Sequence, residues 1–577
     1  MSLLFIKCKK KEHTKISDSE KKEVTQSQFA KNYPEFDLLQ LQQRLAEATV
    51  NDSVLSPFYQ SSQYASAWVH DTLDTDNLYK FVDVLGKTEE HGLPATVFPT
   101  SIIKALTDSV DLAYYKDMDT LYARIVTLDT MATKAAIKYI SGMKYGFLNP
   151  KHLFGKDYDI NIAQPDSAFY VNLYNDIKTN PIDALLAAHP ADDMYLNLKK
   201  EYDLLKEGEE RGFPKINSGN TTFKIGDKSK HITHIAQRLI FTGEYQPQSD
   251  SIPTDSLSYT LDDELLEAIN KFRRHNSLPE EKEVGELTID ALNRPLEYYQ
   301  QKIRANMERY RWQRTKAKHN KHIEVNVASA MLIASQKDSA DLLISRICVG
   351  SIKNKTPLLD GNISYMNLNP YWNVPRSITV KEIIGQQKND PAYIHRNNMK
   401  IFKGGKEVSV SSIDWKKADP AKFPYMIRQE PGPRNALGLV KFMFNNTHSV
   451  YLHDTPNKAA FNRKNRAISH GCIRVQKPYD LAFFCASPVT DVFKDRFFYS
   501  IGKDPQSKEG KELLKANKLK KVSDIINIDK ENRISLFIDY YTVYTYPGES
   551  SLYYADDVYE YDNLILSGLG FSSDTKD

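Results

Sequence analysis

The sequence has few cysteines and no long hydrophobic run. Its 577 residues contain only four cysteines, Cys8, Cys348, Cys472 and Cys485, which excludes a small fold held together by disulfides. Outside the N-terminus, no apolar stretch approaches the roughly 20 residues that a membrane-spanning helix requires. Any link to a membrane is therefore expected at the N-terminal end.

Neither sign of charge dominates. The chain has 77 basic and 74 acidic residues, a net charge of +3, which gives no reason to expect a nucleic-acid partner. Its length exceeds that of a single hydrophobic core and predicts about three to four domains. The 34 tyrosines and 25 phenylalanines could include sugar-stacking residues, although most aromatic side chains belong to cores.

The N-terminus allows two interpretations. Leu3 to Ile6 is shorter than the apolar core of a secretory signal. Cys8, followed by three lysines, nevertheless resembles the end of a lipoprotein signal, although Lys7 stands where a small residue is usual. Residues 1–27 are therefore predicted to be a signal remnant or a flexible tether, and Cys8 is either lipidated or an incidental cysteine.

The most informative motif is Ser469-His470-Gly471-Cys472, which follows His453 along the chain. Val440–Phe444 and Ser449–His453 are β-prone runs separated by a polar turn, so they predict a hairpin that ends at His453. The β-prone pattern resumes at Cys472 and ends before Pro478, which could open a helix. The intervening loop can bring Cys472 next to His453, which would give a thiol nucleophile its base.

Gly471 fits the same chemistry. A residue without Cβ lets the backbone approach a reacting carbonyl and aim N–H groups at the developing oxyanion, which is typical of acyl transfer.

Two other interpretations of the motif remain. A free cysteine is more often a core residue than a nucleophile, as we expect for Cys348 and Cys485. Two histidines and one cysteine could also supply three zinc ligands, but Cys472 lies only two residues from His470 and no Cys-x-x-Cys pair accompanies it.

Together, these residues resemble the signature of the L,D-transpeptidase (YkuD) catalytic domain of bacterial cell-wall enzymes. Asn369–Pro375, Arg428–Gly438 and Val450–Pro456 follow in the order found in the large YcbB-like branch of that family. The combination is specific, whereas His-Gly-Cys alone would be weak.

The resemblance implies a role for each matching position. Cys472 would be the nucleophile, His453 the general base and His470 an orienting or second-shell imidazole, with backbone N–H groups at Gly471 and Cys472 forming the oxyanion hole. Arg474 would hold a substrate carboxylate or carbonyl, unless it is simply an exposed charge on a strand. The remaining candidate substrate-binding residues are Tyr451, Asp454, Ser469, Asn435 and Arg428. Neither a metal nor an organic cofactor is expected.

The resemblance and the periodicity together predict a multidomain α+β fold. An all-α scaffold would span 28–225, and a small three-helix, peptidoglycan-binding-like domain would span 226–305. That domain either binds glycan or is purely architectural, and its Arg273 replaces the usual glutamine. A β-rich catalytic domain would span 306–567, and 568–577 would be a disordered tail. Within the catalytic domain, a polar, helical insertion at about 376–425 would cap the active site as a lid or form a surface excursion.

The predicted function is an exported peptidoglycan L,D-transpeptidase of the periplasm or cell envelope. It would release D-alanine from a tetrapeptide stem through a Cys472 thioester and form 3-3 crosslinks with a neighbouring stem. Its partners would be peptidoglycan stems and glycan, carbapenem-type β-lactams would acylate Cys472, and Cys8 offers the one possible membrane anchor. The alternatives are an L,D-carboxypeptidase or endopeptidase of the same fold and a non-catalytic scaffold that binds the cell wall.

Overall fold

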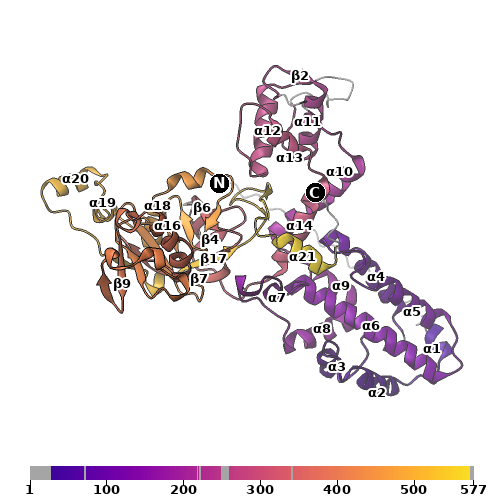
Figure 1. The fold of residues 1–577 in the computed structure, drawn as a ribbon. Helices are drawn as coiled ribbons and strands as arrows, with labels where there is room; N and C mark the ends of the chain where they lie inside the picture. Colours follow the sequence, from indigo (N-terminus) through magenta and orange to yellow (C-terminus); the bar gives the residue numbers. More distant parts are fainter. Residues whose placement is uncertain are drawn as a thin grey trace, which may run out of the picture. The chain divides into compact units, whose positions relative to one another are not determined.

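The computed structural model describes residues 28–70, 73–217, 219, 222–247, 259–339 and 342–571 (Figure 1). The predicted tether and Cys8 lie outside these residues. The chain forms two compact units. The first contains the chain up to Asp83 together with Pro99–Ile137 and Ser167–Ala184, and the second contains Val84–Phe98, Lys138–Asp166 and the chain from Leu185 onward.

The first unit is helical, as the sequence predicts. Its main helices are α2 (Leu38–Thr49), α3 (Ser56–Ser61), α5 (Thr100–Leu112), α8 (Ser167–Thr179) and most of α6 (Met118–Tyr145). Asp129 of α6 is buried and accepts hydrogen bonds from Tyr59 and Ser66, and the Trp68 indole donates to Thr133 at 3.0 Å. Burial raises the pKa of Asp129 to about 6. A polar network therefore fixes α3 and its following loop against α6.

The central helix of the second unit is α14 (Leu296–Arg311), within the predicted span of 295–312. It packs against α10 (Asp193–Arg211) and α21 (Tyr561–Leu569). Arg309 of α14 forms a buried 2.5 Å ion pair with Asp562 of α21. Helix α21 includes residues 568 and 569, so the prediction of a disordered tail starting at 568 is wrong by at least two residues.

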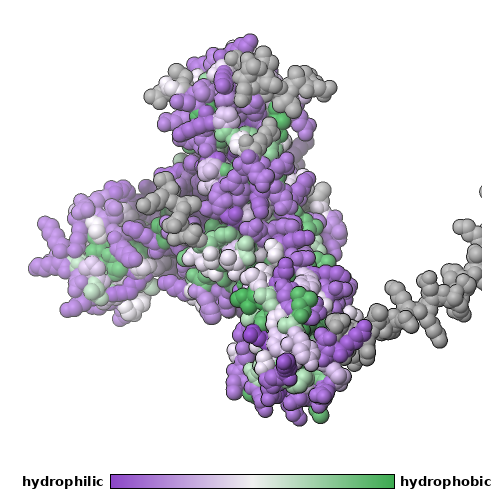
Figure 2. Space-filling model, turned by 90° about the vertical axis from the view of Figure 1, so that its right-hand side faces the viewer, coloured by the Kyte–Doolittle hydropathy of each residue, from purple (hydrophilic) through white to green (hydrophobic). Residues whose placement is uncertain are grey.

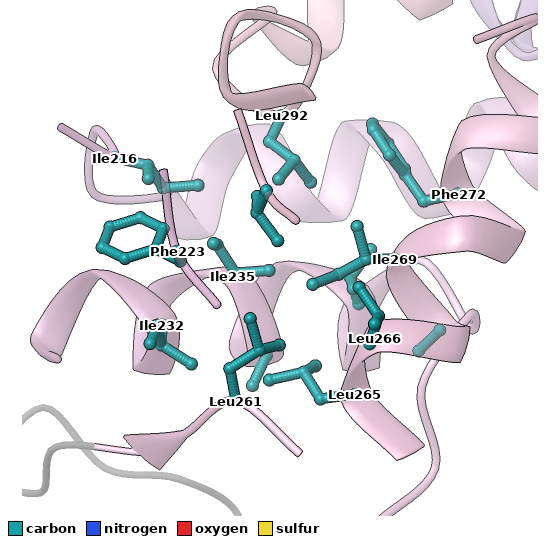
Figure 3. Packing of buried hydrophobic residues seen from close by; sticks show 14 of the residues in the cluster. Ile216, Phe223, Ile232, Ile235, Leu261, Leu265, Leu266, Ile269, Phe272 and Leu292 are labelled. Carbon is teal, nitrogen blue, oxygen red and sulfur yellow. The ribbon is translucent and has the colours of Figure 1, made fainter. Parts of the chain in front are cut away.

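Residues 216–292 form a small bundle of three helices, α11 (Lys230–Phe241), α12 (Asp263–His275) and α13 (Glu286–Leu292). Figure 3 shows apolar side chains from all three helices pointing into one core that includes Ile235, Ile269 and Leu292. Arg273 is fully buried and donates to Thr288 at 2.9 Å and to the Glu281 carbonyl at 2.8 Å. Because these bonds engage its guanidinium inside the bundle, Arg273 holds the loop before α13 rather than a ligand.

The β-rich part of the second unit is a closed sheet with the order β7-β12-β13-β15-β6-β5-β4-β17, in which β17 pairs back with β7. Strands β1, β14 and β16 pair at its margins. The strands are β1 (Tyr158–Asp159), β4 (Lys321–Asn326), β5 (Met331–Gln336), β6 (Leu342–Gly350), β7 (Leu358–Leu368), β12 (Val440–Phe444), β13 (Leu452–His453), β14 (Ala467–Ser469), β15 (Ile473–Val475), β16 (Ile525–Asn527) and β17 (Ile534–Asp539). Alternating burial, as in β4 and β12, gives each strand one face for the core.

The insertion at 376–425 is not simply helical, so that part of the prediction is wrong. It contains α15 (Arg376–Ile378), the π-helix η3 (Thr379–Ile383), α16 (Ile384–Asn389) and α17 (Tyr393–Arg396). It also contributes to a second sheet of order β10-β9-β11-β8. These strands are β8 (Trp372–Asn373), β9 (Met399–Lys403), β10 (Lys406–Val408) and β11 (Met426–Gln429). In β9, Met399 and Ile401 are buried while Lys400 is not. This lysine-rich segment therefore has a short alternation of buried and less buried residues, as a strand requires.

Hydrophilic residues cover most of the face shown in Figure 2, with small hydrophobic patches between them. Within the described ranges, no helix is both long enough and apolar enough to span a bilayer.

Candidate active site

Strands β13 and β15 lie side by side in parallel and place the two halves of the motif together. His453 is opposite Arg474, and the Ile473 N–H donates to the Tyr451 carbonyl at 3.0 Å. Cys472, just before β15, therefore lies beside Tyr451. Since side chains alternate along a strand, Tyr451 and His453 share one face with Cys472 and Arg474. The predicted hairpin is also confirmed, because β12 pairs with β13 in antiparallel fashion.

His453 has the geometry of a neutral base. Its Nδ1 lies 2.5 Å from the Asp454 carbonyl oxygen, which can only accept, so Nδ1 carries the proton and Nε2 is left as the acceptor. Complete burial lowers the pKa of His453 to about 3, and the charges of Arg474 and Lys441 act in the same direction. The imidazole is therefore uncharged at neutral pH, and its Nε2 offers a lone pair as the acceptor.

Opposing effects act on the pKa of the Cys472 thiol. Burial raises its pKa, while hydrogen bonds from the backbone and hydroxyl of Tyr451 and the charges of Lys441 and Arg474 lower it. Burial prevails, so the free thiol is protonated at neutral pH. A protonated thiol needs a base at the moment of attack, and His453 lies on the same face of the sheet.

Two residues that the sequence analysis did not select support Tyr451. Lys441 of β12 places its Nζ 3.8 Å from the centre of the Tyr451 ring and lies opposite His453 across the sheet. The Trp372 indole of β8 reaches the Tyr451 hydroxyl and opposes the rise that burial causes in its pKa. The alternation in Val440–Phe444 gave a signal for Lys441, since it shares the face of His453 in the predicted hairpin. Trp372 belongs to the Asn369–Pro375 motif, but that motif did not indicate a contact with Tyr451.

The turn before Cys472 is built by Ser469 and Gly471. Gly471 has φ +111°, a conformation that disfavours any side chain. Its N–H donates to Ser469 Oγ at 3.1 Å, and its carbonyl accepts from Thr356 Oγ1 at 2.9 Å. Ser469 Oγ also donates to the Cys472 carbonyl at 2.6 Å. Ser469 therefore shapes the turn rather than binding substrate.

These bonds change the expected oxyanion hole. The Gly471 N–H is already engaged by Ser469, so it is not a free donor as we expected. The Cys472 N–H makes no hydrogen bond within the described residues and is the available candidate.

His470 points to the insertion. Its Nε2 lies 2.6 Å from Glu382 Oε1 on the π-helix η3, and both side chains are well exposed. The contact joins the catalytic turn to the insertion, and the orienting role of His470 stays a prediction. Glu382 could not be predicted because it lies far away in the sequence.

Three of the expected substrate-binding residues are engaged in structural contacts. Buried Asp454 accepts from the backbone N–H groups of Leu439 and Thr455 at 2.9 and 2.7 Å. A Cβ on Gly438 would lie only 2.3 Å from Asp454 Oδ2, so this carboxylate packs tightly against the turn before β12.

Asn435 is also buried, and its amide bonds the carbonyls of Pro370 and Glu430 at 3.0 Å each while its oxygen accepts from Leu437. Arg428 pairs with Glu430 at 3.0 Å and lies against Tyr371. Where β11 pairs with β8, Arg428 lies opposite Asn373 and Gln429 lies opposite Trp372. Because neighbouring residues of a strand point to opposite faces, Arg428 lies on the face of β11 away from the one that reaches Tyr451. The structure gives all three residues structural roles.

Arg474 fits its expected role better. It lies half-buried beside His453 and makes no ion pair with any described residue, so its guanidinium is available to a substrate carboxylate.

Within the described ranges, no three His, Cys, Asp or Glu side chains are grouped to hold a metal ion. Cys348 and Cys485 are buried, as expected for core residues.

Comparisons with known proteins match two parts of the chain to family models. Residues 320–492 match the family model described as the L,D-transpeptidase catalytic domain (YkuD), and 53–201 match one described as a scaffold domain. A protein of Haemophilus influenzae described as a candidate L,D-transpeptidase is 42% identical over 161 residues, which are 28% of this chain and 32% of the relative. The match thus spans about a third of the relative's length.

A crystal structure of an L,D-transpeptidase from Xylanimonas cellulosilytica is 12% identical. The alignment covers 48% of this chain and 93% of that one, with a TM-score of 0.16, a value too low to indicate a shared fold.

Proposed function

We propose that this chain, which carries a YkuD-family L,D-transpeptidase catalytic domain over residues 320–492, crosslinks peptidoglycan stems through a thioester on Cys472. The observation that carries the proposal is the shared sheet face of Tyr451, His453, Cys472 and Arg474, with the His453 tautomer fixed by the Asp454 carbonyl. This arrangement supplies a nucleophile, a base and a free cation to one small region.

In the first half-reaction, Cys472 Sγ attacks the carbonyl that follows the third residue of a tetrapeptide stem, and His453 Nε2 takes the thiol proton. The oxyanion is stabilised by the Cys472 N–H. The amide bond to the terminal D-alanine breaks, and the departing amine recovers the proton from His453. A thioester between Cys472 and the tripeptide stem remains.

In the second half-reaction, the side-chain amine of a diamino acid in a neighbouring stem attacks the thioester. His453 accepts the amine proton and returns it to the departing thiolate, so that a 3-3 crosslink forms and the free thiol is restored. Arg474 would bind a carboxylate of one of the two stems.

The insertion is proposed to cap this site. Its support is the pair of contacts that come from it and its adjoining strand, Glu382 with His470 and Trp372 with Tyr451. A cap would limit the access of water to the thioester and so favour an amine acceptor over hydrolysis.

The same site is proposed to react with carbapenem-type β-lactams, since their strained carbonyl would meet Cys472 as the stem carbonyl does. We also propose that the protein acts outside the cytoplasm, where its polymeric substrate lies. Glycan binding by the bundle at 226–305 and lipidation of Cys8 remain separate proposals.

The test is incubation of the purified chain with disaccharide-tetrapeptide, followed by mass spectrometry of the products. We expect a dimer that lacks one D-alanine, with Cys348→Ala as a matched variant that keeps the activity and Cys472→Ala as one that abolishes it. Tripeptide without dimer would identify a peptidase instead. Equal product from the Cys472→Ala variant would contradict any role for the thiol and favour a wall-binding scaffold.

A further inference from the structure

A basic cavity of about 720 Å³ lies beside the segment that leads into the catalytic turn. Its walls come from the β4–β5 turn at 327–331, from β6, from residues 462–467 and from the stretch 544–558, and the end of α12 adds Arg274. All of these belong to the second unit. The proposed mechanism uses none of the side chains that line the cavity.

Positive charge outweighs negative charge in the lining of this cavity. Arg346 of β6, together with Arg463, Lys464 and Arg466, lines it, and the acidic lining consists of Asp556. None of these four cations forms an ion pair with any residue that the structure describes. By contrast, Arg274 is paired with Glu267 and Glu280. Several like charges held around one cavity create a positive potential that favours an anionic ligand.

Arg466 is held rigidly at the cavity wall. It donates to the Ser329 carbonyl at 2.8 Å and to the Arg463 carbonyl at 3.3 Å, while its Nε is buried without a hydrogen-bond partner. Burial lowers the pKa of Arg466, and the charge of Arg346 lowers it further. Tyr546 lines the same cavity, and the charges of both arginines oppose the rise that burial causes in the pKa of its hydroxyl. An anion bound here would relieve the repulsion between the two guanidinium groups.

The ligand chemistry follows from these groups. Guanidinium groups bind carboxylates and phosphates with paired hydrogen bonds, and tyrosine rings offer apolar faces to sugars and aliphatic chains. A peptidoglycan strand presents carboxylates on every stem, so the proposed substrate itself is the nearest source of such anions.

We propose that this cavity binds a carboxylate-bearing peptide stem of the peptidoglycan strand. This stem is neither the donor that acylates Cys472 nor the acceptor that attacks the thioester. The inference rests on the proposed function, because that function supplies the ligand. Residues 462–467 lead directly into β14 and the Ser469–Cys472 turn, so a stem held here would anchor the strand next to the catalytic segment. The cavity thus contributes to substrate binding and not to the chemical step.

The test counts binding sites on the full chain carrying Cys472→Ala, which prevents turnover. Disaccharide-tetrapeptide is titrated by calorimetry into this protein and into the same protein with Arg346→Gln and Arg463→Gln. Both side chains are exposed, so their replacement leaves the core intact. Lys416→Gln with Lys417→Gln, two exposed lysines of the insertion, is the matched control.

We expect the Arg346→Gln, Arg463→Gln variant to lose one binding event, or to weaken it about tenfold or more, while the control keeps it. Amidation of the stem carboxylates should have the same effect as the arginine substitutions. Unchanged binding in the arginine variant would overturn the proposal. So would an event that survives amidation but is displaced by inorganic phosphate, since that would identify a phosphate site.

Different results would contradict the proposed function and the proposed binding of a stem in the cavity. With Cys472 intact, the arginine variant should still form the thioester with disaccharide-tetrapeptide, and its loss of a binding event would support the cavity alone. A cavity event that is lost as expected, in a chain that forms no thioester, would contradict the proposed function but not the anionic site.

Discussion

At the scale of single residues, Lys441 is one of the groups that lower the pKa of the Cys472 thiol against its burial, because its position over the Tyr451 ring brings a positive charge close to the sulfur. Lys441→Met should remove this effect, so the thiol pKa should rise and alkylation should shift to higher pH. The measurement is the rate of alkylation of the Cys472 peptide by iodoacetamide against pH. Lys416→Met is the control, and superimposable profiles for the Lys441 variant and the parent would contradict this role.

The low pKa of His453 predicts an unusual pH profile. A histidine near 6.5 would be mostly protonated at pH 5 and lose about 30-fold of its activity as a base. With a pKa of about 3, His453 stays neutral at pH 5, so the single-turnover release of D-alanine should change by less than about twofold between pH 7 and pH 5. A fall that follows a group titrating near 6.5 would show that His453 is not the buried neutral base described here.

At the scale of elements, the insertion meets the catalytic turn through Glu382 and His470. Glu382→Gln keeps the size of the side chain and removes its charge. Since exposed ion pairs contribute at most about 1 kcal/mol, we expect a change of up to about fivefold in the ratio of crosslinked dimer to tripeptide, in favour of tripeptide. Glu407→Gln, which loses an exposed pair with Lys400 on the same insertion, is the control. An unchanged ratio of dimer to tripeptide would show that the contact between Glu382 and His470 has no part in capping the site.

Helix α10 contains a carboxyl group that opposes stability at high pH. Burial, together with the charge of Glu244, raises the pKa of Glu201 to about 7. The unfolded chain ionises this group near 4.5, so above that value the folded state pays a growing penalty, which is complete above pH 7. Glu201→Gln should therefore stabilise the protein at pH 8 by up to about 3 kcal/mol and raise its melting temperature there, with little effect at pH 4. The glutamine can still accept from Tyr554, as Glu201 does at 3.3 Å. Equal shifts at both pH values would contradict this account.

At the scale of the whole molecule, much of the fold was predictable because the signals were local. The helical N-terminal region, the helix at 295–312 and the β12–β13 hairpin each follow from short-range periodicity. The approach of Cys472 to His453 instead depends on the parallel pairing of β13 with β15, which the loop length permits but local periodicity does not dictate. The strands of the insertion were not predicted, since they are short and rich in lysine. Trp372 and Glu382 were missed because they reach the site from a segment whose fold had not been identified.

Some of the expected site residues lie on the face that forms the candidate site, whereas others form structural hydrogen bonds. A motif position indicates that a residue belongs near the site, but not which way its side chain faces. Cys472, His453, Tyr451 and Arg474 lie on the sheet face that forms the site. Asp454, Asn435 and Ser469 form hydrogen bonds with backbone groups, a detail that depends on the folded loops and not on spacing.

The most direct test of the central claim is a peptide map of the rapidly quenched protein after mixing with isotope-labelled disaccharide-tetrapeptide. We predict that the peptide containing Cys472 gains the mass of the donor stem without its terminal D-alanine, as a hydroxylamine-sensitive adduct that disappears when an acceptor amine is added. Formation of crosslinked product without any adduct on Cys472, or an adduct on another residue, would contradict the account.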